Sequence, residues 1–145
     1  MTAQRSTNEE NNYRKYLKNE NDSSCPFCSI DINHPQYIEE TKYFKIIKNK
    51  FPYSIWDGAK VKEHIMLVPI RHIGSLSQVN AGEANDFANI LSQYEKQNYN
   101  FYGRTHSSNV KSVVHQHTHL LKLGERQHKF VLMLRKPIYI RVSLR

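Results

Sequence analysis

Three histidines alternate with polar residues in a short segment near the end of the chain, His115, His117 and His119. Gln116 and Thr118 separate them, and apolar residues flank the segment on both sides. Alternation inside an apolar frame predicts a β-strand, in which every second side chain points to the same face. We therefore expect the three imidazoles to emerge together from one face of a strand.

The middle imidazole, His117, has the chemistry of a nucleophile or base. An ordinary histidine pKa of about 6.5 leaves the ring mostly neutral at cellular pH, so one ring nitrogen offers a free lone pair. Attack on phosphorus by that nitrogen splits one difficult transfer into two easier ones. The other ring nitrogen would then hold its proton toward a fixed acceptor such as a backbone carbonyl. His119 and the hydroxyl of Ser112 would donate hydrogen bonds to the phosphoryl oxygens.

Two other interpretations of the histidine row stay open from the residues alone. The row can be an exposed polar strand face with incidental histidines. It can also be a metal site, but three side chains on one flat face cannot easily converge on one ion, because zinc holds its donors within about 2.0–2.3 Å. The middle histidine is therefore better interpreted as a reacting group than as a ligand.

Residues 115–121 resemble the signature of the histidine triad family of nucleotide hydrolases and transferases, although Gln116 and Thr118 are more polar than usual. Upstream segments strengthen the resemblance, and they follow the family's order. They are the Cys-Pro-Phe-Cys segment 25–28, the Asn-Lys-Phe-Pro-Tyr segment 49–53 and the segment 64–73, which has the pattern His-φ-φ-φ-φ-Pro-x-x-His-φ. The similarity covers about residues 25–140.

The resemblance implies that His117 takes a nucleoside monophosphate from its α-phosphate as a covalent nucleotidyl-histidine, which water normally resolves. It places His119 on the phosphate and leaving-group side and Ser112 on the phosphate oxygens. It also places Asn49 on the ribose hydroxyls and Phe51 in the wall of the nucleotide pocket. A strand-end turn residue and a core aromatic are the structural alternatives for these last two. The implied substrates are purine nucleoside phosphoramidates or dinucleoside polyphosphates, with adenine or guanine as base, and the implied assembly is a homodimer.

The approach to the histidines departs from the family pattern. Many members have a Gly-rich approach with Gln before the serine, whereas here Lys111 precedes Ser112, which makes Lys111 a candidate nucleotide-binding residue. Arg104 stands where many relatives have an asparagine near the nucleotide. These departures bear on substrate identity more than on reaction type.

The chain has two cysteines, Cys25 and Cys28, and its start shows no pattern of a secretory signal. A structural disulfide is therefore not expected, and the Cys-x-x-Cys spacing indicates metal or redox chemistry. Residues 21–38 are too polar and irregular for the strand–helix–strand setting of a thioredoxin-like site.

Structural zinc is four-coordinate and needs two further ligands beside the cysteines. His64 and His115 each begin an expected strand, and if these strands pair, both imidazoles can meet the thiolates in a Cys₂His₂ site. Some histidine triad members look like this. His34 and His72 are the substitutes if His64 is not a ligand.

These residues require a fold that brings distant segments together, and we expect one α+β domain with an antiparallel sheet of about five strands and one main helix. Residues 1–24 are rich in Asn, Glu, Ser and Lys and are expected to form a mostly mobile tail, with a short helix around 13–17. Residues 25–145 are expected to form the histidine triad domain. We expect strands at 43–47 and 64–70, with an inserted loop at 54–63 that contains a turn at Asp57-Gly58. A helix at 80–98, capped by Asn80, follows, and a segment 99–103 leads into a loop. A last strand at 130–134 or 139–142 completes the sheet.

The formal net charge of +8 favours anionic partners, and both nucleotides and nucleic acids qualify. A solvated basic edge is favoured over a nucleic-acid surface for the basic residues of the last quarter of the chain.

No apolar run approaches the length of a membrane span, so we expect a cytoplasmic protein. Three hypotheses follow: a nucleotide hydrolase or transferase, a zinc-stabilised nucleotide-binding module with little turnover, and a basic nucleic-acid-binding protein. The basic residues of the last quarter of the chain, on which the third hypothesis depends, are Lys122, Arg126, Lys129, Arg135, Lys136, Arg141 and Arg145.

Overall fold

The computed structural model describes residues 3–19, 24–109, 111–126, 130–135 and 139–144. In chain order its elements are β1 (Ala3–Gln4), α1 (Thr7–Asn19), β2 (Tyr37–Glu40), β3 (Phe44–Lys48), β4 (Ile55–Trp56), β5 (Ala59–Pro69), the 3₁₀ helix η1 (Leu76–Gln78), α2 (Ala81–Lys96), β6 (Tyr99–Gly103), β7 (Thr118–Arg126), β8 (Phe130–Arg135) and β9 (Tyr139–Leu144). No described helix is long and apolar enough to span a membrane.

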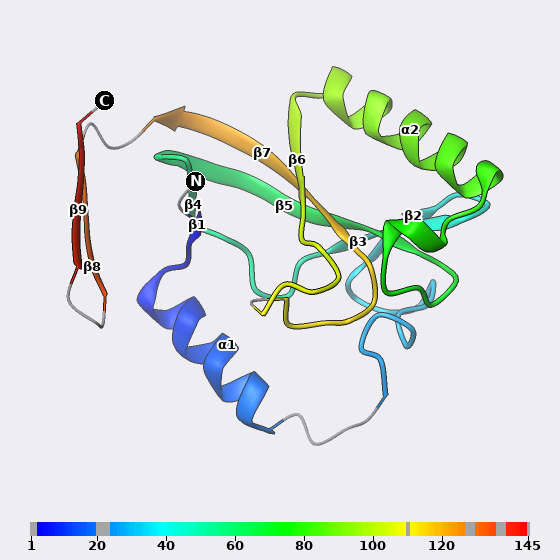
Figure 1. Cartoon of the computed structure of the whole chain (residues 1–145), viewed down its shortest axis with the longest axis horizontal. Coiled ribbons are helices and arrows are strands. Elements are labelled where there is room, and N and C mark those ends of the chain that lie inside the picture. Colours follow the sequence, from blue (N-terminus) through cyan, green and yellow to red (C-terminus); the bar gives the residue numbers. More distant parts are fainter. Residues whose placement is uncertain (1–2, 20–23, 110, 127–129, 136–138, 145) are drawn as a thin grey trace.

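Five antiparallel strands form the body of the main sheet, in the order β2-β3-β5-β7-β6. The central strand β5 runs through residues 64–69, which are all buried, as expected for a strand that is covered on both faces. β4 pairs with the first residues of β5, and β1 pairs with β4, so the sheet has seven strands in all. The predicted α+β class with an antiparallel sheet is confirmed (Figure 1).

Helix α2 covers one face of this sheet (Figure 1). Asn80 caps it, because its side chain accepts a hydrogen bond from the backbone N–H of Glu83 while the Glu83 carboxylate accepts one from the N–H of Asn80. The predicted helix thus begins where the cap indicated, and it ends at Lys96 rather than Asn98, which has a left-handed φ of 64°. The core between helix and sheet consists of Phe44, Ile46, Ile65, Leu67, Ile90, Tyr94, Tyr99 and Leu120, with Tyr43, Phe87 and Leu91 packed against it.

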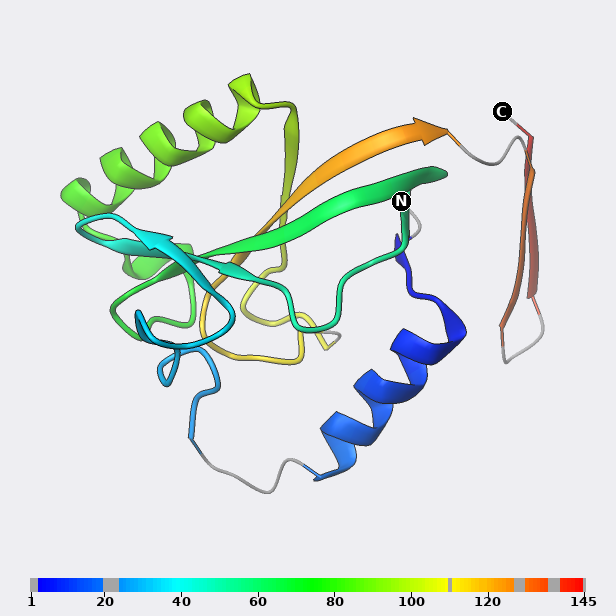
Figure 2. The ribbon, with the colours of Figure 1, turned by 180° about the vertical axis from the view of Figure 1, so that it is seen from behind.

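The opposite face of the sheet carries the histidines, because strand side chains alternate. Ile65 and Leu120 are paired residues that face α2, so their neighbours His64 and His119 point to the other side. Segment 24–30 packs there through Phe27 and Ile30. Helix α1 also lies on this side, away from α2 (Figures 1 and 2).

The predicted strand through the whole histidine row is wrong at its start. β7 begins at Thr118, so His115 and His117 lie in the irregular segment that enters the strand, and His119 alone belongs to the strand. The imidazoles therefore do not form a regular row on one face. The irregular backbone frees the carbonyl of His115 for a side-chain contact that a strand ladder would have taken.

Three other expectations are corrected. The N-terminal segment contains β1 and the thirteen-residue α1, where the sequence indicated a mostly mobile tail with a short helix. Residues 54–63 are not an inserted loop: β4 and β5 form a tight hairpin whose turn residues Asp57 and Gly58 have positive φ of 53° and 79°, as a two-residue turn requires. In the described part of the chain, β8 and β9 pair with each other in a separate two-stranded sheet and do not complete the main one (Figure 2).

Candidate functional site

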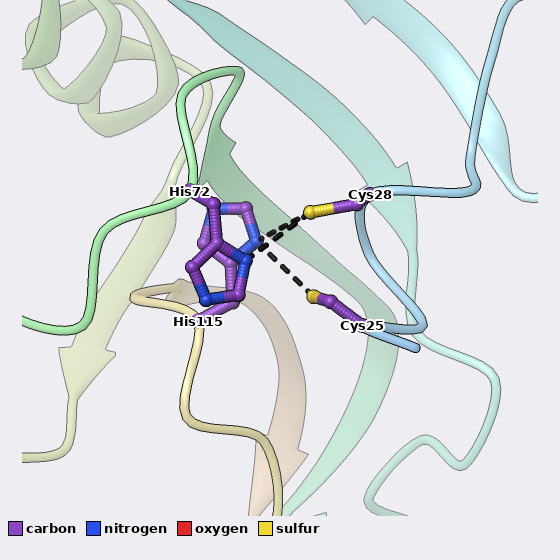
Figure 3. A group of neighbouring side chains, drawn as sticks. All are labelled: Cys25, Cys28, His72 and His115. Atoms are coloured by element: carbon purple, nitrogen blue, oxygen red, sulfur yellow. Dashed lines mark hydrogen bonds between the residues drawn. The ribbon is translucent and has the colours of Figure 1, made fainter. Parts of the chain in front are cut away.

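Two cysteines and two histidines meet at one end of the sheet (Figure 3). β5 and β7 are antiparallel neighbours, so the end of β5 lies beside the start of β7. His72 follows β5 by three residues and His115 precedes β7 by three residues, which brings the two rings to a centroid distance of 4.5 Å. The donor atoms of Cys25, Cys28, His72 and His115 all lie within 4.8 Å of one another. We call these four residues the Cys–His cluster.

A turn presents the two thiols of the Cys–His cluster. The backbone N–H of Cys28 donates to the carbonyl of Cys25 at 3.0 Å, which closes the turn. Phe27 and Ile30 are buried against the sheet and anchor the segment. Both sulfurs are therefore directed toward the histidines, as Figure 3 shows.

The ring of His115 is oriented for ligation through Nδ1. Its Nε2–H donates to the carbonyl of Pro69 at 3.0 Å, so in the neutral ring Nδ1 carries the lone pair. That nitrogen lies 3.4 Å from Cys25 Sγ and 3.6 Å from Cys28 Sγ. His72 Nδ1 lies 3.2 Å from Cys28 Sγ. Burial and the neighbouring His72 lower the pKa of His115 to about 4, which keeps it neutral.

The cluster fits the geometry of tetrahedral zinc. Bond lengths of about 2.3 Å to sulfur and 2.0–2.1 Å to nitrogen place S and N donors about 3.5 Å apart around one ion. The S···N distances of 3.2–3.6 Å in the cluster match this spacing. The hydrogen bond from His115 to Pro69 is the outer contact that metal-bound histidines usually make.

His64, which we predicted as the fourth ligand, is not in the cluster, and the substitute His72 takes that place. The register explains the correction: His64 pairs with Leu121, well inside the sheet, whereas His115 lies before the strand begins. His34, the other substitute, instead accepts a hydrogen bond from the N–H of Gln36 at 3.1 Å.

His64 forms a pair with His119 on the strand face. His64 Nδ1 accepts a hydrogen bond from the N–H of Tyr53 at 3.0 Å, so its proton is on Nε2, which lies 2.9 Å from Nδ1 of His119. His119 therefore accepts through Nδ1 and keeps its own proton on Nε2. Burial lowers the pKa of His64 to about 3 and that of His119 well below the usual value, so both rings stay neutral.

His117 has the ring orientation expected of a nucleophile. Its Nδ1–H donates to the carbonyl of His115 at 2.8 Å, so the lone pair is on Nε2. No described residue forms a hydrogen bond with that nitrogen, and the ring packs against Phe27 at a centroid distance of 5.1 Å. Burial lowers the pKa of His117 despite the carbonyl contact.

A cavity of about 330 Å³ lies beside these rings, which is within the usual size of small-molecule sites. His117 and His119 line it together with Ser112, Asn49 and Phe51, so it brings together five of the residues that the sequence singled out. Its other lining residues are Ala3, Arg5, Glu10, Tyr13, Tyr16, Pro26, Phe27, Ile30, Gln36, Lys50, Tyr53, Met66, Arg104 and Val113.

Asn49 holds a turn at the wall of the cavity. Its Oδ1 accepts a hydrogen bond from the N–H of Phe51 at 2.8 Å, which is the contact of a turn residue. Its side-chain nitrogen lies 3.0 Å from Nε2 of His64, at the wall of the cavity. The turn thereby holds the amide where a bound ligand can reach it.

Lys111 is not among the described residues that line the cavity. Its ammonium donates to Oε1 of Gln116 at 2.9 Å and to the carbonyl of Gly74 at 3.2 Å. These contacts tie the segment before β7 to the loop after β5, and the nucleotide-binding role of Lys111 stays a prediction.

Sequence reasoning missed the contribution of the N-terminal segment to the cavity. Arg5, Tyr13 and Tyr16 all line it. Tyr13 and Tyr16 stand three residues apart, which is the spacing of one helix face, and this signal was available. Tyr53 was seen only as part of a motif, although its ring stacks on His64 at a centroid distance of 4.8 Å.

No family model matches the sequence, and no curated protein matches it significantly. Solved structures do resemble it. A HIT (histidine triad) family hydrolase from Legionella pneumophila Philadelphia 1 is 26% identical with a TM-score of 0.52, over 72% of this chain and 95% of that one. A HIT family hydrolase from Clostridium thermocellum is 22% identical with a TM-score of 0.54, over 74% and 96%.

A histidine triad protein from Clostridium difficile is 20% identical with a TM-score of 0.50, over 74% of this chain and 96% of that one. All three likenesses thus cover nearly the whole of the known structures. Together with the sheet, the covering helix α2 and the placement of His117 and His119, they confirm the resemblance seen in the sequence at the level of fold. The chain has the fold of the histidine triad family.

Proposed function

We propose that this protein is a nucleotide hydrolase or nucleotidyl transferase that acts at the α-phosphate, with His117 as the nucleophile. The observation that carries the proposal is the orientation of His117: a backbone carbonyl holds the Nδ1 proton, and the Nε2 lone pair is left on a ring that lines the cavity. The likeness to two structures described as HIT family hydrolases supports the same reaction class.

The proposed reaction has two displacements at phosphorus. In the first, Nε2 of His117 forms a bond to the α-phosphorus, and the bond to the leaving group breaks with its electron pair. The Nδ1 proton stays on the ring, where the carbonyl of His115 stabilises the positive charge that the ring acquires. In the second, the oxygen of water or another hydroxyl acceptor forms a bond to phosphorus and releases its proton to solvent, and the P–N bond breaks with its electron pair returning to Nε2 of His117.

Two side chains are proposed to assist at the phosphoryl group. His119 keeps its Nε2–H as a donor because its Nδ1 accepts from His64, and it lines the cavity. Ser112 offers a hydroxyl in the same lining. Donors fixed before the reaction stabilise the charge that develops on phosphoryl oxygens, and this effect is usually a large part of catalysis. Asn49 and Phe51 are proposed to contact the ribose and the base.

The Cys–His cluster is proposed to hold a structural zinc ion. Cys25, Cys28, His72 and His115 would bind it, and when bound it would fix segment 25–28 and the loop after β5 to the segment that carries His117. The ring of His115 would thereby have a structural role, while its carbonyl orients His117. A homodimer is also proposed, on the resemblance of the sequence to the histidine triad family alone, and sedimentation at several concentrations tests it.

The test is adenylate release from adenosine 5′-phosphoramidate and from diadenosine polyphosphates by wild-type protein, His117→Ala and the control His106→Ala. His106 is an exposed histidine outside the cavity. We expect release by wild-type and by the control, and a fall of about 10³-fold or more in kcat/KM for His117→Ala, because the nucleophile is lost.

Absence of release by wild-type protein, or equal release by His117→Ala, would contradict the proposal. Binding of AMP without turnover would instead favour a nucleotide-binding module. Salt-sensitive binding of oligonucleotides without binding of mononucleotides would favour the nucleic-acid hypothesis.

A further inference from the structure

Helix α1 lies on the side of the sheet that carries the histidines (Figures 1 and 2), and its residues line part of the cavity. The N-terminal segment contributes Arg5, Glu10, Tyr13 and Tyr16 to the cavity lining. The expected mobile tail had no role in the site, whereas these side chains add aromatic and charged groups to it.

Specific contacts hold α1 in this place. The rings of Tyr13 and Tyr16 pack on Phe51 at centroid distances of 5.4 and 5.1 Å. Nε of Arg5 donates to the carbonyl of Phe51 at 3.1 Å, and its guanidinium lies 4.1 Å from the centroid of the Tyr13 ring. The N–H of Ser6 donates to the Ser54 hydroxyl at 2.9 Å. The helix is thus joined to the segment that contains the predicted nucleotide contacts.

Contacts connect Phe51 to both parts of the cavity. Asn49 touches His64 with one side-chain atom and the N–H of Phe51 with the other. Phe51 in turn touches Tyr13 and Tyr16. Arg5 gives a second connection, because its guanidinium lies 4.9 Å from the centroid of the Tyr53 ring, which stacks on His64. The aromatic rings at Phe51 thus neighbour the residue proposed to contact ribose, which is where the base of a nucleotide is attached.

The chemistry around Phe51 suits a planar aromatic ligand. Phe51, Tyr13 and Tyr16 gather there, and every nucleobase has a face on which such rings can stack. The cation of Arg5 lies over the Tyr13 ring. The cavity measures about 330 Å³ with α1 in place, so the helix lines the pocket and does not fill it.

We propose that α1 forms the outer wall of the nucleotide pocket, and that Tyr13 and Tyr16, together with Phe51, bind the base of the nucleotide. The proposal rests on the proposed function for the class of ligand. Tyr13 and Tyr16 are then determinants of affinity and base selection and take no part in the bond changes at phosphorus.

The test measures equilibrium binding of AMP and of ribose 5-phosphate to the full chain by calorimetry. The variants are Tyr13→Ala, Tyr16→Ala, the conservative Tyr13→Phe and Tyr16→Phe, and Asn12→Ala as a control at an exposed position of the same helix. Loss of a stacking ring should weaken AMP binding by about 5- to 150-fold. The phenylalanine variants and Asn12→Ala should bind AMP as wild-type does, and ribose 5-phosphate, which has no base, should bind all variants equally.

Several outcomes would overturn the assignment. If wild-type binds AMP and the alanine variants bind it equally well, α1 does not bind the base, while the proposed function stands. If the alanine variants lose AMP and ribose 5-phosphate to the same extent, the tyrosines have only a structural role. If wild-type binds neither compound, the proposed function fails together with this inference.

Discussion

His115 and His117 are two residues apart and have opposite ring orientations. The ring of His115 donates from Nε2 to the carbonyl of Pro69 and turns Nδ1 toward two sulfurs. The ring of His117 donates from Nδ1 to the carbonyl of His115 and leaves Nε2 beside the cavity. In each case one backbone carbonyl selects the nitrogen that keeps the lone pair. The position of that carbonyl, and not the residue type, separates the candidate ligand from the candidate nucleophile.

The neighbouring groups of the two rings also differ. His115 belongs to the Cys–His cluster, where Cys28 and His72 are exposed and sulfur is the neighbouring atom. His117 packs against the ring of Phe27 and has His119 as its neighbour at a centroid distance of 5.1 Å. A change in one region should therefore affect metal content, and a change in the other should affect turnover.

The largest effect is expected from breaking the Cys–His cluster. Cys25→Ser, Cys28→Ser and His72→Ala should reduce zinc from one ion per chain to near zero and lower the melting temperature, because structural zinc binding is worth about 10–16 kcal/mol in small domains. His64→Gln is the matched control and should retain the metal. Zinc content by atomic absorption provides the measurement. Retention of stoichiometric zinc by the cysteine variants would remove them from the site.

A smaller effect is expected from His64, which acts on the pocket through His119. His64→Gln removes the ring that accepts from the N–H of Tyr53 and donates to Nδ1 of His119. We expect kcat to fall by about 10²-fold with little change in KM, because a catalytic donor is misplaced while the binding contacts remain. Steady-state kinetics with adenosine 5′-phosphoramidate measure both constants. A rise in KM at unchanged kcat would instead make His64 a binding residue.

Acid should destabilise the folded protein through the buried histidines that border the cavity. The folded chain holds His64 neutral with a pKa of about 3, whereas the unfolded chain takes up a proton below about pH 6.5. The unfolded state thus binds more protons between these values, so stability is fully present above pH 6.5 and decreases toward pH 3. Each such histidine contributes about 1.4 kcal/mol per pH unit. Urea unfolding at pH 7 and pH 5 should show this slope in wild-type and a shallower one in His64→Gln, and equal slopes would refute the assignment.

The smallest effect is expected from Asn80→Ala, which should change neither the Cys–His cluster nor the cavity. Asn80 caps α2 on the far face of the sheet. Asn80→Ala should lower the free energy of unfolding by about 1 kcal/mol through the lost cap. Zinc content and kcat should not change, since neither ring depends on that cap. A loss of either property would mean that α2 and the histidine face are coupled.

The helix and the central strand could be predicted because local signals determine them. Asn80 and Glu83 form a capping box, and the apolar stripe of α2 has helical spacing. The buried run from Ile65 to Val68 reads as a strand by itself. The residue types of the Cys–His cluster could also be predicted, since a zinc site with two cysteines needs two further donors.

The fourth member of the Cys–His cluster could not be predicted, because it depends on the register of the strands. His64 and His72 are both histidines of one motif, and only the pairing of Met66 with His119 decides which of them reaches His115. A shift in register changes every such contact. The start of β7 could not be predicted either. The apolar flanks suggested a strand where the structure has an irregular segment before Thr118.

Helix α1 was underestimated because little of its stability comes from local apolar pattern. Tyr13 and Tyr16 are set among polar residues, and the surface that they cover belongs to Phe51, far away in the sequence. Tertiary packing of this kind supports most helices in proteins and has only a weak signal in one sequence.

We propose that His117 becomes covalently attached to the nucleotide, while His115 binds metal as part of the Cys–His cluster. Rapid mixing of the zinc-loaded protein with adenosine 5′-phosphoramidate, followed by quenching under conditions that preserve P–N bonds and by peptide mapping, locates the adenylate directly. We predict adenylate on His117 alone, at early times and before product accumulates. Adenylate on His115 or His119, or consumption of substrate with no adenylated residue at any time, would contradict the account.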